Sequence, residues 1–299
     1  MKLMVFDVGG TEIKYGVMDQ DCNITDKGYV PTPMDSFEHF SQVIYDLYEP
    51  HKDEVKGIAM ALPGFIDADK GLVLGSGALH YNWGKAVGPL LSEKCGCPVS
   101  IENDGKAAAW AEYLKGSLQG CTNAAVFLIG TGVGGGIIIN GEVVRGVHAT
   151  AGEFSYINRD PNLFGQYEGF VGSCCATRGL LGTYKKLKQT DEAIDGREFF
   201  RRLPDDPIAQ EVLDDFALKI ARQCFNLYWL LDTEKIAIGG GVSRQPILID
   251  TIRKKFDEML QVCAFRNVLT PIHMDIIRST YGNEANMIGA YMAYTRKYQ

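Results

Sequence analysis

Three glycine-rich turns, each directly after an apolar run, are the first feature of this sequence that could do chemistry. They read "DVGGT" (7–11), "GTGVGGG" (130–136) and "GGG" (239–241). Glycine has no Cβ, so the backbone N–H groups of such turns can converge on a phosphate. One such turn alone is better explained by tight-turn geometry, but three of them favour phosphate binding. Two phosphate-binding turns that face each other would suit the β- and γ-phosphates of ATP.

Carboxylates close to these turns offer groups for catalysis and metal binding. Asp7 ends the first apolar run, where it could hold Mg²⁺ or cap the turn. Asn103 and Asp104 lie in "IENDGKAAAW", and either could cap the helix that follows. Phosphoryl transfer to an alcohol, however, needs a carboxylate within hydrogen-bond reach of the hydroxyl. Glu153, in "HATAGEFSY", is either a surface charge or a carboxylate that binds something polar.

Strands and helices that alternate along the chain must position these residues. We expect strands within 2–8, 12–19, 24–32, 55–64, 98–104, 123–132, 135–146 and 235–243. We expect helices within 36–50, 82–96, 105–116, 206–232 and 283–298, with Ser36 as the cap of the first. Trp83, Tyr228 and Trp229 are expected in the core.

An apolar strand, a glycine turn and a second strand occur twice, from residue 4 and again from residue 123. The second hairpin has Asn140-Gly141 at its tip, a pair typical of tight β-hairpins. The repetition predicts two α/β lobes of related topology, a smaller one at 1–116 and a larger one at 117–283. The C-terminal helix, about 284–299, is expected to pack back on the first lobe. The match to G-x-G-x-x-G at 130–135 precedes this hairpin instead of a helix, which disfavours a dinucleotide-binding fold.

Composition excludes several classes of partner. The net charge is −7, so a nucleic acid or an anionic membrane surface is not an expected partner. Apolar runs stay well short of the roughly 18 residues of a membrane span. The chain enters its first strand without a signal-like segment. Its eight cysteines are therefore expected to be reduced thiols in a cytoplasmic protein.

Six motifs together resemble those of the ROK-family sugar kinases in order and spacing. They are "FDVGGTEIKYGV", "ALPG", "ENDGKAAAWAE", "GTGVGGGIIINGEVVRG", "AGE" and "IAIGGGVS", and they span residues 3 to about 242. The resemblance implies an α/β, two-lobed sugar kinase/actin-like (ribonuclease H-like) fold with sugar and ATP in an interlobe cleft. It also implies ATP and Mg²⁺ as cofactors and a sugar as the phosphoryl acceptor. We expect a homodimer.

The resemblance also assigns roles to individual residues. Asp104 matches the base that takes the proton from the sugar hydroxyl, usually O6. The implied sugar-binding residues are Gly64, Asn103, Asp104, Glu153 and Tyr156. The implied ATP- and phosphate-binding residues are Asp7, Gly9, Gly10, Thr11, Lys14, Gly130, Thr131, Gly132, Gly134, Gly240 and Gly241, and Asp7 is also the candidate Mg²⁺ ligand.

The sequence departs from the family pattern around a structural zinc. Most members have a histidine where this chain has Tyr156, and three cysteines downstream where it has only Cys174-Cys175. Adjacent cysteines and a tyrosine cannot close a tetrahedral zinc site, so we predict no structural zinc. A family glutamate near the sugar's O1/O2 side is also replaced, by Ser173 or Cys174. Small and apolar groups there could accommodate a substituent on O1. The "AGEF-x-Y" segment without the zinc cluster also resembles the bacterial β-glucoside kinases of this family, and the resemblance implies a β-glucoside or disaccharide such as cellobiose as the acceptor.

Other functions compete with this interpretation. Kinases of glucose or N-acetylmannosamine remain open, because Glu153 and Asn103 would serve any hexose. A ROK-type transcriptional regulator would carry a winged-helix domain of about eighty residues ahead of the kinase-like body. With the first phosphate motif at residue 7, we expect no such domain. A non-catalytic sugar-binding module would predict loss of Asp104 or degraded phosphate turns, and both are intact.

Overall fold

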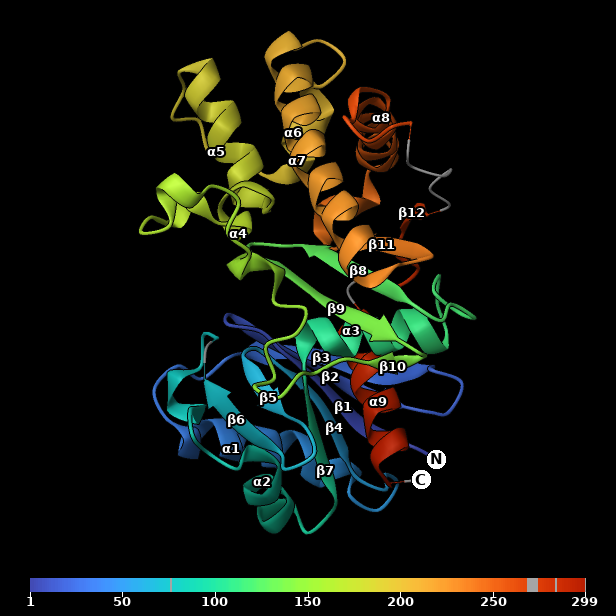
Figure 1. Ribbon diagram of the computed structural model, residues 1–299. Coiled ribbons are helices and arrows are strands. Elements are labelled where there is room, and N and C mark those ends of the chain that lie inside the picture. The colour runs from blue at the N-terminus through green and yellow to red at the C-terminus, as the bar shows by residue number, and fades with distance from the viewer. Residues whose placement is uncertain (76, 268–273, 283, 299) are drawn as a thin grey trace. The chain divides into compact units, whose positions relative to one another are not determined.

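The computed structural model describes residues 1–75, 77–267, 274–282 and 284–298, and within them the chain forms two compact units (Figure 1). Unit 1 comprises Met1–Leu114, Val143–Ala151 and Glu284–Gln299, and unit 2 comprises Lys115–Glu142 and Gly152–Asn283. The expected second lobe ends at residue 283 and the expected C-terminal helix ends at residue 299. Both residues lie outside the described residues. The lobe boundaries at 116 and 283 stay a prediction, and each unit is described here by itself.

The main sheet of unit 1 has the strand order β3-β2-β1-β4-β7. Its strands are β1 (Leu3–Val8), β2 (Glu12–Met18), β3 (Ile24–Pro31), β4 (Ile58–Leu62) and β7 (Val99–Asn103), and a separate hairpin joins β5 (Phe65–Asp67) to β6 (Leu72–Gly75). β1 pairs antiparallel with β2 and parallel with β4, and β4 pairs parallel with β7. The parallel strands read as continuous apolar runs because both faces of the sheet are covered. Their carboxyl ends carry Asp7 and Asn103.

The helices of unit 1 cover this sheet. They are α1 (Phe37–Tyr48), α2 (Val87–Cys95), α3 (Asp104–Leu114) and α9 (Ala285–Tyr298), with the short 3-10 helices η1 (Glu49–His51) and η2 (His80–Asn82). Ser36 caps α1, as expected, by accepting from the His39 backbone N–H at 3.2 Å. α9, the last helix of the chain, packs against α3, and the Arg296 guanidinium lies 4.6 Å from the centre of the Trp110 ring.

The sheet of unit 2 repeats this topology with the order β10-β9-β8-β11-β12. Its strands are β8 (Ala124–Ile129), β9 (Val133–Ile139), β10 (Glu142–Val143), β11 (Lys235–Gly239) and β12 (Asp275–Arg278). β8 pairs antiparallel with β9 and parallel with β11, as β1 does with β2 and β4. The β9–β10 turn has positive φ at Asn140 (51°) and Gly141 (76°), as a tight hairpin turn requires. The related topology predicted from the repeated hairpin is therefore confirmed.

The helices of unit 2 pack around a second core. They are α4 (Val171–Cys174), α5 (Thr177–Lys188), α6 (Gly196–Arg202), α7 (Pro207–Leu231) and α8 (Pro246–Val262), with the 3-10 helices η3 (Phe154–Tyr156), η4 (Pro161–Leu163), η5 (Tyr167–Gly169) and η6 (Gly241–Arg244). In the described part of the chain, no helix combines the length and apolar character needed to cross a membrane.

The assignment of both tryptophans to the core is wrong. Trp83 is 46% exposed and Trp229 is 54% exposed. Trp229 lies in the last turn of α7, where it packs on Tyr228 and Phe225 at ring-centre distances of 5.3 and 6.2 Å. Neighbouring aromatic side chains on the same helix thus cover part of the indole without burying it.

Candidate active site

The junction of β7 and α3 places Asn103 and Asp104 in unit 1. The Asn103 side chain caps α3, because its Oδ1 accepts from the Lys106 N–H at 3.0 Å. Its Nδ2 donates to the carbonyl of Gly64 at 3.0 Å, so Asn103 also ties this junction to the "ALPG" turn. Asp104 is the first residue of α3, partly exposed, and its Oδ1 accepts from the Gly105 N–H at 2.8 Å. Of the two possible helix caps, Asn103 takes the role, and Asp104 presents a carboxylate beside it.

A buried ion pair behind this junction was missed by sequence reasoning. Glu102 is 1% exposed, and its Oε2 accepts from Arg145 Nε at 3.0 Å and Nη2 at 2.6 Å. The other carboxylate oxygen, Oε1, accepts from the Asn103 N–H at 3.0 Å. The pair therefore fixes the backbone immediately before Asp104. Glu102 lies within the "ENDG" motif, but its partner is 43 residues away, so the sequence held no signal for the pairing.

Asp7 and the first glycine turn lie at the ends of β1 and β2. Asp7 faces Lys14 across the two strands, with its Oδ2 3.8 Å from Lys14 Nζ, and its Oδ1 accepts from Asn286 Nδ2 of α9 at 2.9 Å. Burial raises the pKa of the Asp7 carboxyl, which the Asn286 hydrogen bond and the Lys14 charge partly offset. The turn itself closes with a bond from the Gly9 N–H to the Glu12 carbonyl at 2.9 Å. Gly10 and Thr11 are exposed at the tip of this turn.

The other two glycine turns meet in unit 2. The Gly130 N–H donates to the Gly132 carbonyl at 2.9 Å, which leaves Thr131 and Gly132 exposed at the tip between β8 and β9. Gly240 has φ of +93°, and an added Cβ would lie 2.2 Å from the Ile129 carbonyl oxygen. Only glycine therefore lets the turn after β11 approach the end of β8.

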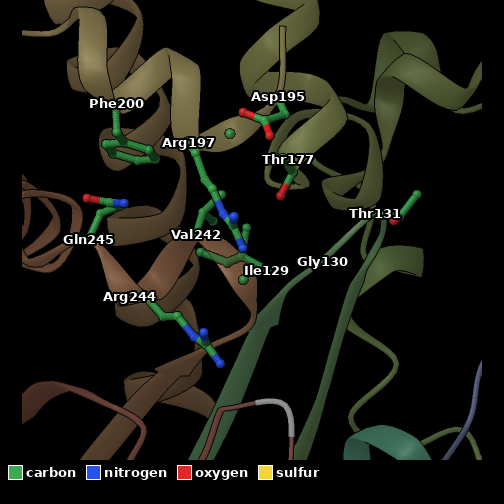
Figure 2. A pocket seen from close by; sticks show the side chains of 12 residues that line it. Ile129, Gly130, Thr131, Thr177, Asp195, Arg197, Phe200, Val242, Arg244 and Gln245 are labelled. Carbon is green, nitrogen blue, oxygen red and sulfur yellow. The ribbon is translucent and has the colours of Figure 1, made fainter. Parts of the chain in front are cut away.

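This approach creates a pocket of about 430 Å³ within unit 2 (Figure 2). Gly130, Thr131 and Gly241 come from the two turns, and the other lining residues are Ile129, Thr177, Asp195, Gly196, Arg197, Phe200, Val242, Arg244 and Gln245. Figure 2 shows the Arg197 side chain extending from α6 toward Val242 and Ile129. The size lies in the range of small-ligand sites, and the lining combines glycine turns, guanidinium groups and an aromatic ring. Sequence reasoning found the turns but missed Arg197 and Arg244, because single arginines carry no motif.

The loop with Glu153 and Tyr156 is anchored to the hairpin of β8 and β9. Phe154 is buried and stacks on Phe127 of β8 with ring centres 5.4 Å apart. Ser155 Oγ accepts from the Val133 N–H at 3.1 Å and donates to the Val133 carbonyl at 2.6 Å. Because the two residues between them are fixed, Glu153 and Tyr156 have defined positions, and Tyr156 is 58% exposed.

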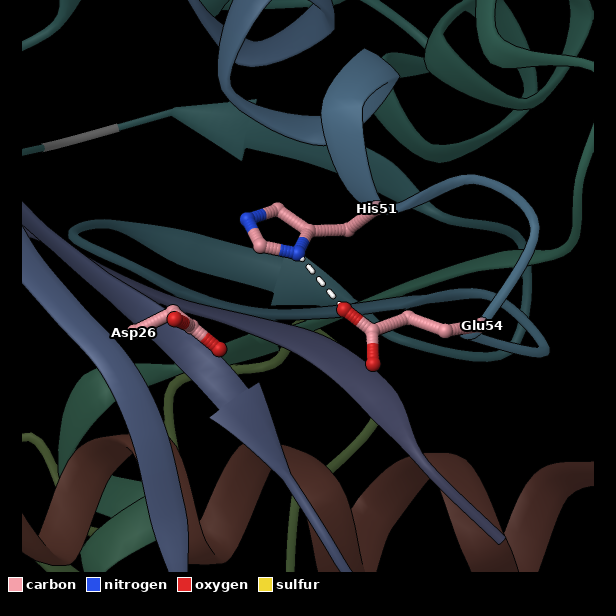
Figure 3. A group of neighbouring side chains, drawn as sticks. All are labelled: Asp26, His51 and Glu54. Carbon is pink, nitrogen blue, oxygen red and sulfur yellow. Dashed lines mark hydrogen bonds and ion pairs between the residues drawn. The ribbon is translucent and has the colours of Figure 1, made fainter.

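The residues in the place of the family's zinc cluster do not fit a zinc ion. Cys174 and Cys175 are adjacent, with Sγ atoms 3.7 Å apart, and a tetrahedral site needs four ligands. Among the described residues, Asp26, His51 and Glu54 of unit 1 form the one group of three potential ligands (Figure 3). There His51 Nδ1 lies 2.7 Å from Glu54 Oε1, and Lys2 donates to Glu54 Oε2 at 3.1 Å. This group is accounted for as a surface ion-pair network.

Comparisons with known proteins all point to one protein family. The model of the ROK family matches residues 4–297. A beta-glucoside kinase of Klebsiella pneumoniae is 29% identical over 307 residues, covering 100% of this chain and 98% of the relative. A ROK family protein of Streptococcus pneumoniae, solved in complex with sucrose, has a TM-score of 0.88, 26% identity and 99% coverage of both chains. A ROK family glucokinase of Streptomyces griseus, solved with glucose and AMPPNP, has a TM-score of 0.81, 26% identity and coverage of 97% and 98%.

The family match, the similar kinases and the similar solved structures together show an ATP-dependent sugar kinase with the α/β, sugar kinase/actin-like fold. A sugar and ATP are its substrates. The chain belongs to the ROK family.

Proposed function

We propose that this kinase transfers the γ-phosphoryl group of ATP to O6 of a glucosyl unit that carries a substituent on O1. The expected substrates are β-glucosides and disaccharides such as cellobiose, with glucose as a smaller acceptor. The similarity to a beta-glucoside kinase over the full length of both chains supports this choice.

The exposed aromatic side chains after Glu153 are the observation that carries the proposal. Tyr156, Phe164 and Tyr167 lie in one short segment of unit 2 and are 58%, 68% and 47% exposed. Aromatic rings offer large apolar faces that can pack against a second sugar ring or an aglycone. A carboxylate at Glu153 followed by such faces suits a sugar whose hydroxyls are bound at one end and whose reducing end is substituted.

Residues of unit 1 supply the proposed chemistry at the hydroxyl. Asp104 acts as the general base that accepts the proton of O6 as the oxygen attacks the γ-phosphorus. Asn103 and Gly64, which are joined by a hydrogen bond, shape the wall of the sugar site next to this carboxylate. The Glu102–Arg145 pair positions the backbone before Asp104. In unit 2, Glu153 accepts hydrogen bonds from sugar hydroxyls and Tyr156 contacts the reducing end.

The nucleotide is assigned to the glycine turns. Gly9, Gly10, Thr11 and Lys14 of unit 1 and Gly130, Thr131, Gly132 and Gly134 of unit 2 bind phosphates through backbone N–H groups, the threonine hydroxyls and one ammonium group. Gly240 and Gly241 border the pocket of unit 2, which we assign to adenosine. The guanidinium groups of Arg197 and Arg244, opposed in part by the Asp195 carboxylate, can pair with the phosphates attached to the adenosine.

Carboxylate oxygens are ligands that Mg²⁺ prefers, and Asp7 lies at the end of β1 beside the first glycine turn, so Asp7 is the proposed residue to hold Mg²⁺ or its water shell in competition with Lys14 and Asn286. Bound Mg²⁺ would neutralise charge that develops on the phosphates.

A homodimer also remains part of the proposal, and analytical ultracentrifugation checks it.

A screen of ATP consumption tests the substrate assignment. The acceptors are glucose, N-acetylmannosamine, N-acetylglucosamine, mannose, fructose, cellobiose and gentiobiose. Cellobiose and gentiobiose are expected to be phosphorylated with the highest kcat/KM. Methyl β-glucoside should also react, whereas its 6-deoxy derivative should be inert, because it lacks the accepting hydroxyl.

The screen also decides between alternatives. If cellobiose and gentiobiose are inert while glucose or N-acetylmannosamine turns over, the β-glucoside assignment fails and the kinase acts on a free hexose. If the 6-deoxy glucoside is phosphorylated, the assignment of O6 fails.

A further inference from the structure

Two adjacent cysteines lie where α4 meets α5, and the proposed phosphoryl transfer does not use them. Cys174 is partly exposed, whereas Cys175 is fully buried in the core of unit 2. Their Sγ atoms are 3.7 Å apart. A small reagent can therefore reach one thiol, and the second thiol is held next to it away from solvent.

We propose that Cys174 and Cys175 form a reversible modification site, at which a peroxide converts the two thiols into a disulfide between adjacent residues. The Cys174 thiolate attacks one peroxide oxygen, the O–O bond breaks and hydroxide leaves. The sulfur is oxidised to a sulfenic acid while the peroxide is reduced. The Cys175 sulfur then attacks the Cys174 sulfur, the S–O bond breaks, and the hydroxide leaves as water with the Cys175 proton. A dithiol reductant returns both thiols.

The surroundings favour Cys174 as the thiol that reacts first. The hydrogen bond with Cys175 lowers the pKa of Cys174, and the positive charges of Arg159 and Lys219 act in the same direction. A lowered pKa places more of the sulfur in the nucleophilic thiolate form. Cys95 is also partly exposed, but burial raises its pKa to about 11. The Cys95-Gly96-Cys97 segment of unit 1 is therefore an internal control with two thiols and low thiolate content.

Covalent geometry makes the modification reversible. The Cα atoms of adjacent residues are about 3.8 Å apart across a trans peptide, whereas disulfides usually join Cα atoms about 4.4–6.8 Å apart. A disulfide between Cys174 and Cys175 is therefore strained, and strained disulfides are reduced more readily than structural ones. Reducing conditions thus restore the thiols once the peroxide is gone.

The backbone around the pair connects it to two loops of unit 2. At Gly172 an added Cβ would lie 2.9 Å from Ser155 Oγ, so α4 packs directly on Ser155, one of the two residues between Glu153 and Tyr156. On the other side, the Thr177 N–H donates to the Gly130 carbonyl at 3.0 Å. Disulfide closure must rearrange the backbone between these two contacts. We expect this rearrangement to loosen the 152–158 loop whatever the protein's substrate, whereas an effect on sugar phosphorylation rests on the proposed function.

Mass spectrometry of the full-length protein tests the chemistry. Trypsin cleavage after Arg159 and Arg178 yields a peptide, 160–178, that contains only Cys174 and Cys175 as cysteines. At a hydrogen peroxide dose that leaves Cys95 and Cys97 reduced, this peptide should lose two hydrogens and regain them with dithiothreitol. In Cys175→Ala, dimedone should trap Cys174 as a sulfenic acid, and in Cys174→Ala the remaining Cys175 should stay reduced. Oxidation of 160–178 no faster than that of Cys95 and Cys97, or oxidation that persists in Cys174→Ala, overturns the proposal.

Hydrogen exchange and kinetics test the consequence separately. Peroxide should speed amide exchange in residues 152–158 of the wild type but not of Cys174→Ala, and this readout does not depend on kinase activity. The kcat/KM for the sugar should fall about 10- to 100-fold and recover with reductant, as a displaced binding group predicts. If the disulfide forms without a change in exchange, the connection to the loop is wrong. If exchange changes and sugar kinetics do not, the role proposed for Glu153 is wrong and the modification site stands.

Discussion

Asp104 combines two properties that a general base needs, a partly exposed carboxylate and a fixed backbone. Asn103 takes the helix cap, and the Glu102–Arg145 pair holds the residue before it. Asn103, and not Asp104, accepts from the Lys106 N–H as the cap of α3, although both residue types are good caps. The carboxylate can be removed without removing the cap, so substitution at this position separates chemistry from folding.

Asp104→Asn is expected to lower kcat by at least about 10²-fold, because an amide cannot accept the hydroxyl proton. The dissociation constants for AMPPNP and for sugar, measured by isothermal titration calorimetry, should stay close to those of the wild type. Asp69→Asn, at an exposed aspartate of the same unit, is the matched control and should keep full activity. Turnover by Asp104→Asn near the wild-type rate would rule out its role as the base.

At the scale of single residues, the sequence predicts which site residues belong to motifs. It misses site residues whose partners lie far away in the chain. The "ENDG" motif singles out Asn103 and Asp104 but does not say which one caps the helix, because both side chains offer a suitable oxygen. Arg145 lies in the "GTGVGGGIIINGEVVRG" motif without an assigned role, and Arg197 belongs to no motif. Their positions near the site follow only from the tertiary structure.

Asp206 shows how one side chain fixes an element in place. Its Oδ1 accepts from the Ile208 N–H at 3.0 Å at the start of α7, while its Oδ2 accepts from Tyr184 Oη at 2.7 Å and Lys188 Nζ at 2.9 Å. The carboxylate thus caps the longest helix of unit 2 and ties it to α5. The hydrogen bond from Lys188, followed by that from Tyr184, lowers the pKa of Asp206 to about 2.

Replacing Asp206 by alanine should lower the free energy of unfolding by about 1–2 kcal/mol, the usual cost of a lost cap. Asp206→Asn keeps an oxygen for the cap but loses the charge. Since the folded-state pKa is depressed below the unfolded value of about 3.9, the charge stabilises the protein above that pH and ceases to do so as the pH falls toward 2. Urea unfolding at several pH values should show the wild type and Asp206→Asn converging with acidification. Asp205→Asn, at the exposed neighbour, should follow the wild type throughout; a gap that widens toward acid would contradict the charge argument.

Element types followed from periodicity, and the limits of that reasoning are visible in two places. The repeated strand–glycine–strand pattern predicted two lobes of related topology, because hydrophobic runs and turn residues are local signals, but the sequence analysis missed β12 of the second sheet. The apolar pattern of α7 continues to its end, yet Trp229 and Leu230 there are 54% and 76% exposed. Periodicity reports the face of a helix, not how far the neighbouring core extends along it. The short 3-10 helices between 154 and 169 have no periodic pattern, so the anchoring of the first of them, η3, on β9 could not be predicted.

Where most members of the family hold a structural zinc, this chain offers fewer metal ligands than a zinc ion requires. Purified full-length protein should therefore contain zinc far below one ion per chain by elemental analysis, because a structural zinc site needs four ligands. Treatment with a chelator should leave its Tm unchanged. Stoichiometric zinc that resists dialysis would contradict this prediction.

Unit 1 is completed by the end of the chain, since α9 comes from residues more than 130 positions after the rest of that unit. Its contact with α3 depends on Gly289, where an added Cβ would lie 1.7 Å from the Ala107 carbonyl oxygen. α3 begins with Asp104, so the C-terminal helix supports the element that carries the proposed base. A side chain at 289 must push the two helices apart, against a close-packed interior.

Gly289→Ala is therefore expected to lower the free energy of unfolding by about 1–3 kcal/mol, although alanine favours helices, and to lower kcat as well. Gly182→Ala is the matched control in α5, because nothing lies within 4 Å of an added Cβ there. It should stabilise unit 2 by about 0.5–1 kcal/mol, since only helix propensity changes. Urea unfolding followed by circular dichroism and by activity measures both variants. The opposite signs at the two glycines are the decisive result: if Gly289→Ala stabilises the protein as Gly182→Ala does, α9 is not packed on α3 as described, and its support of the Asp104 helix falls with that packing.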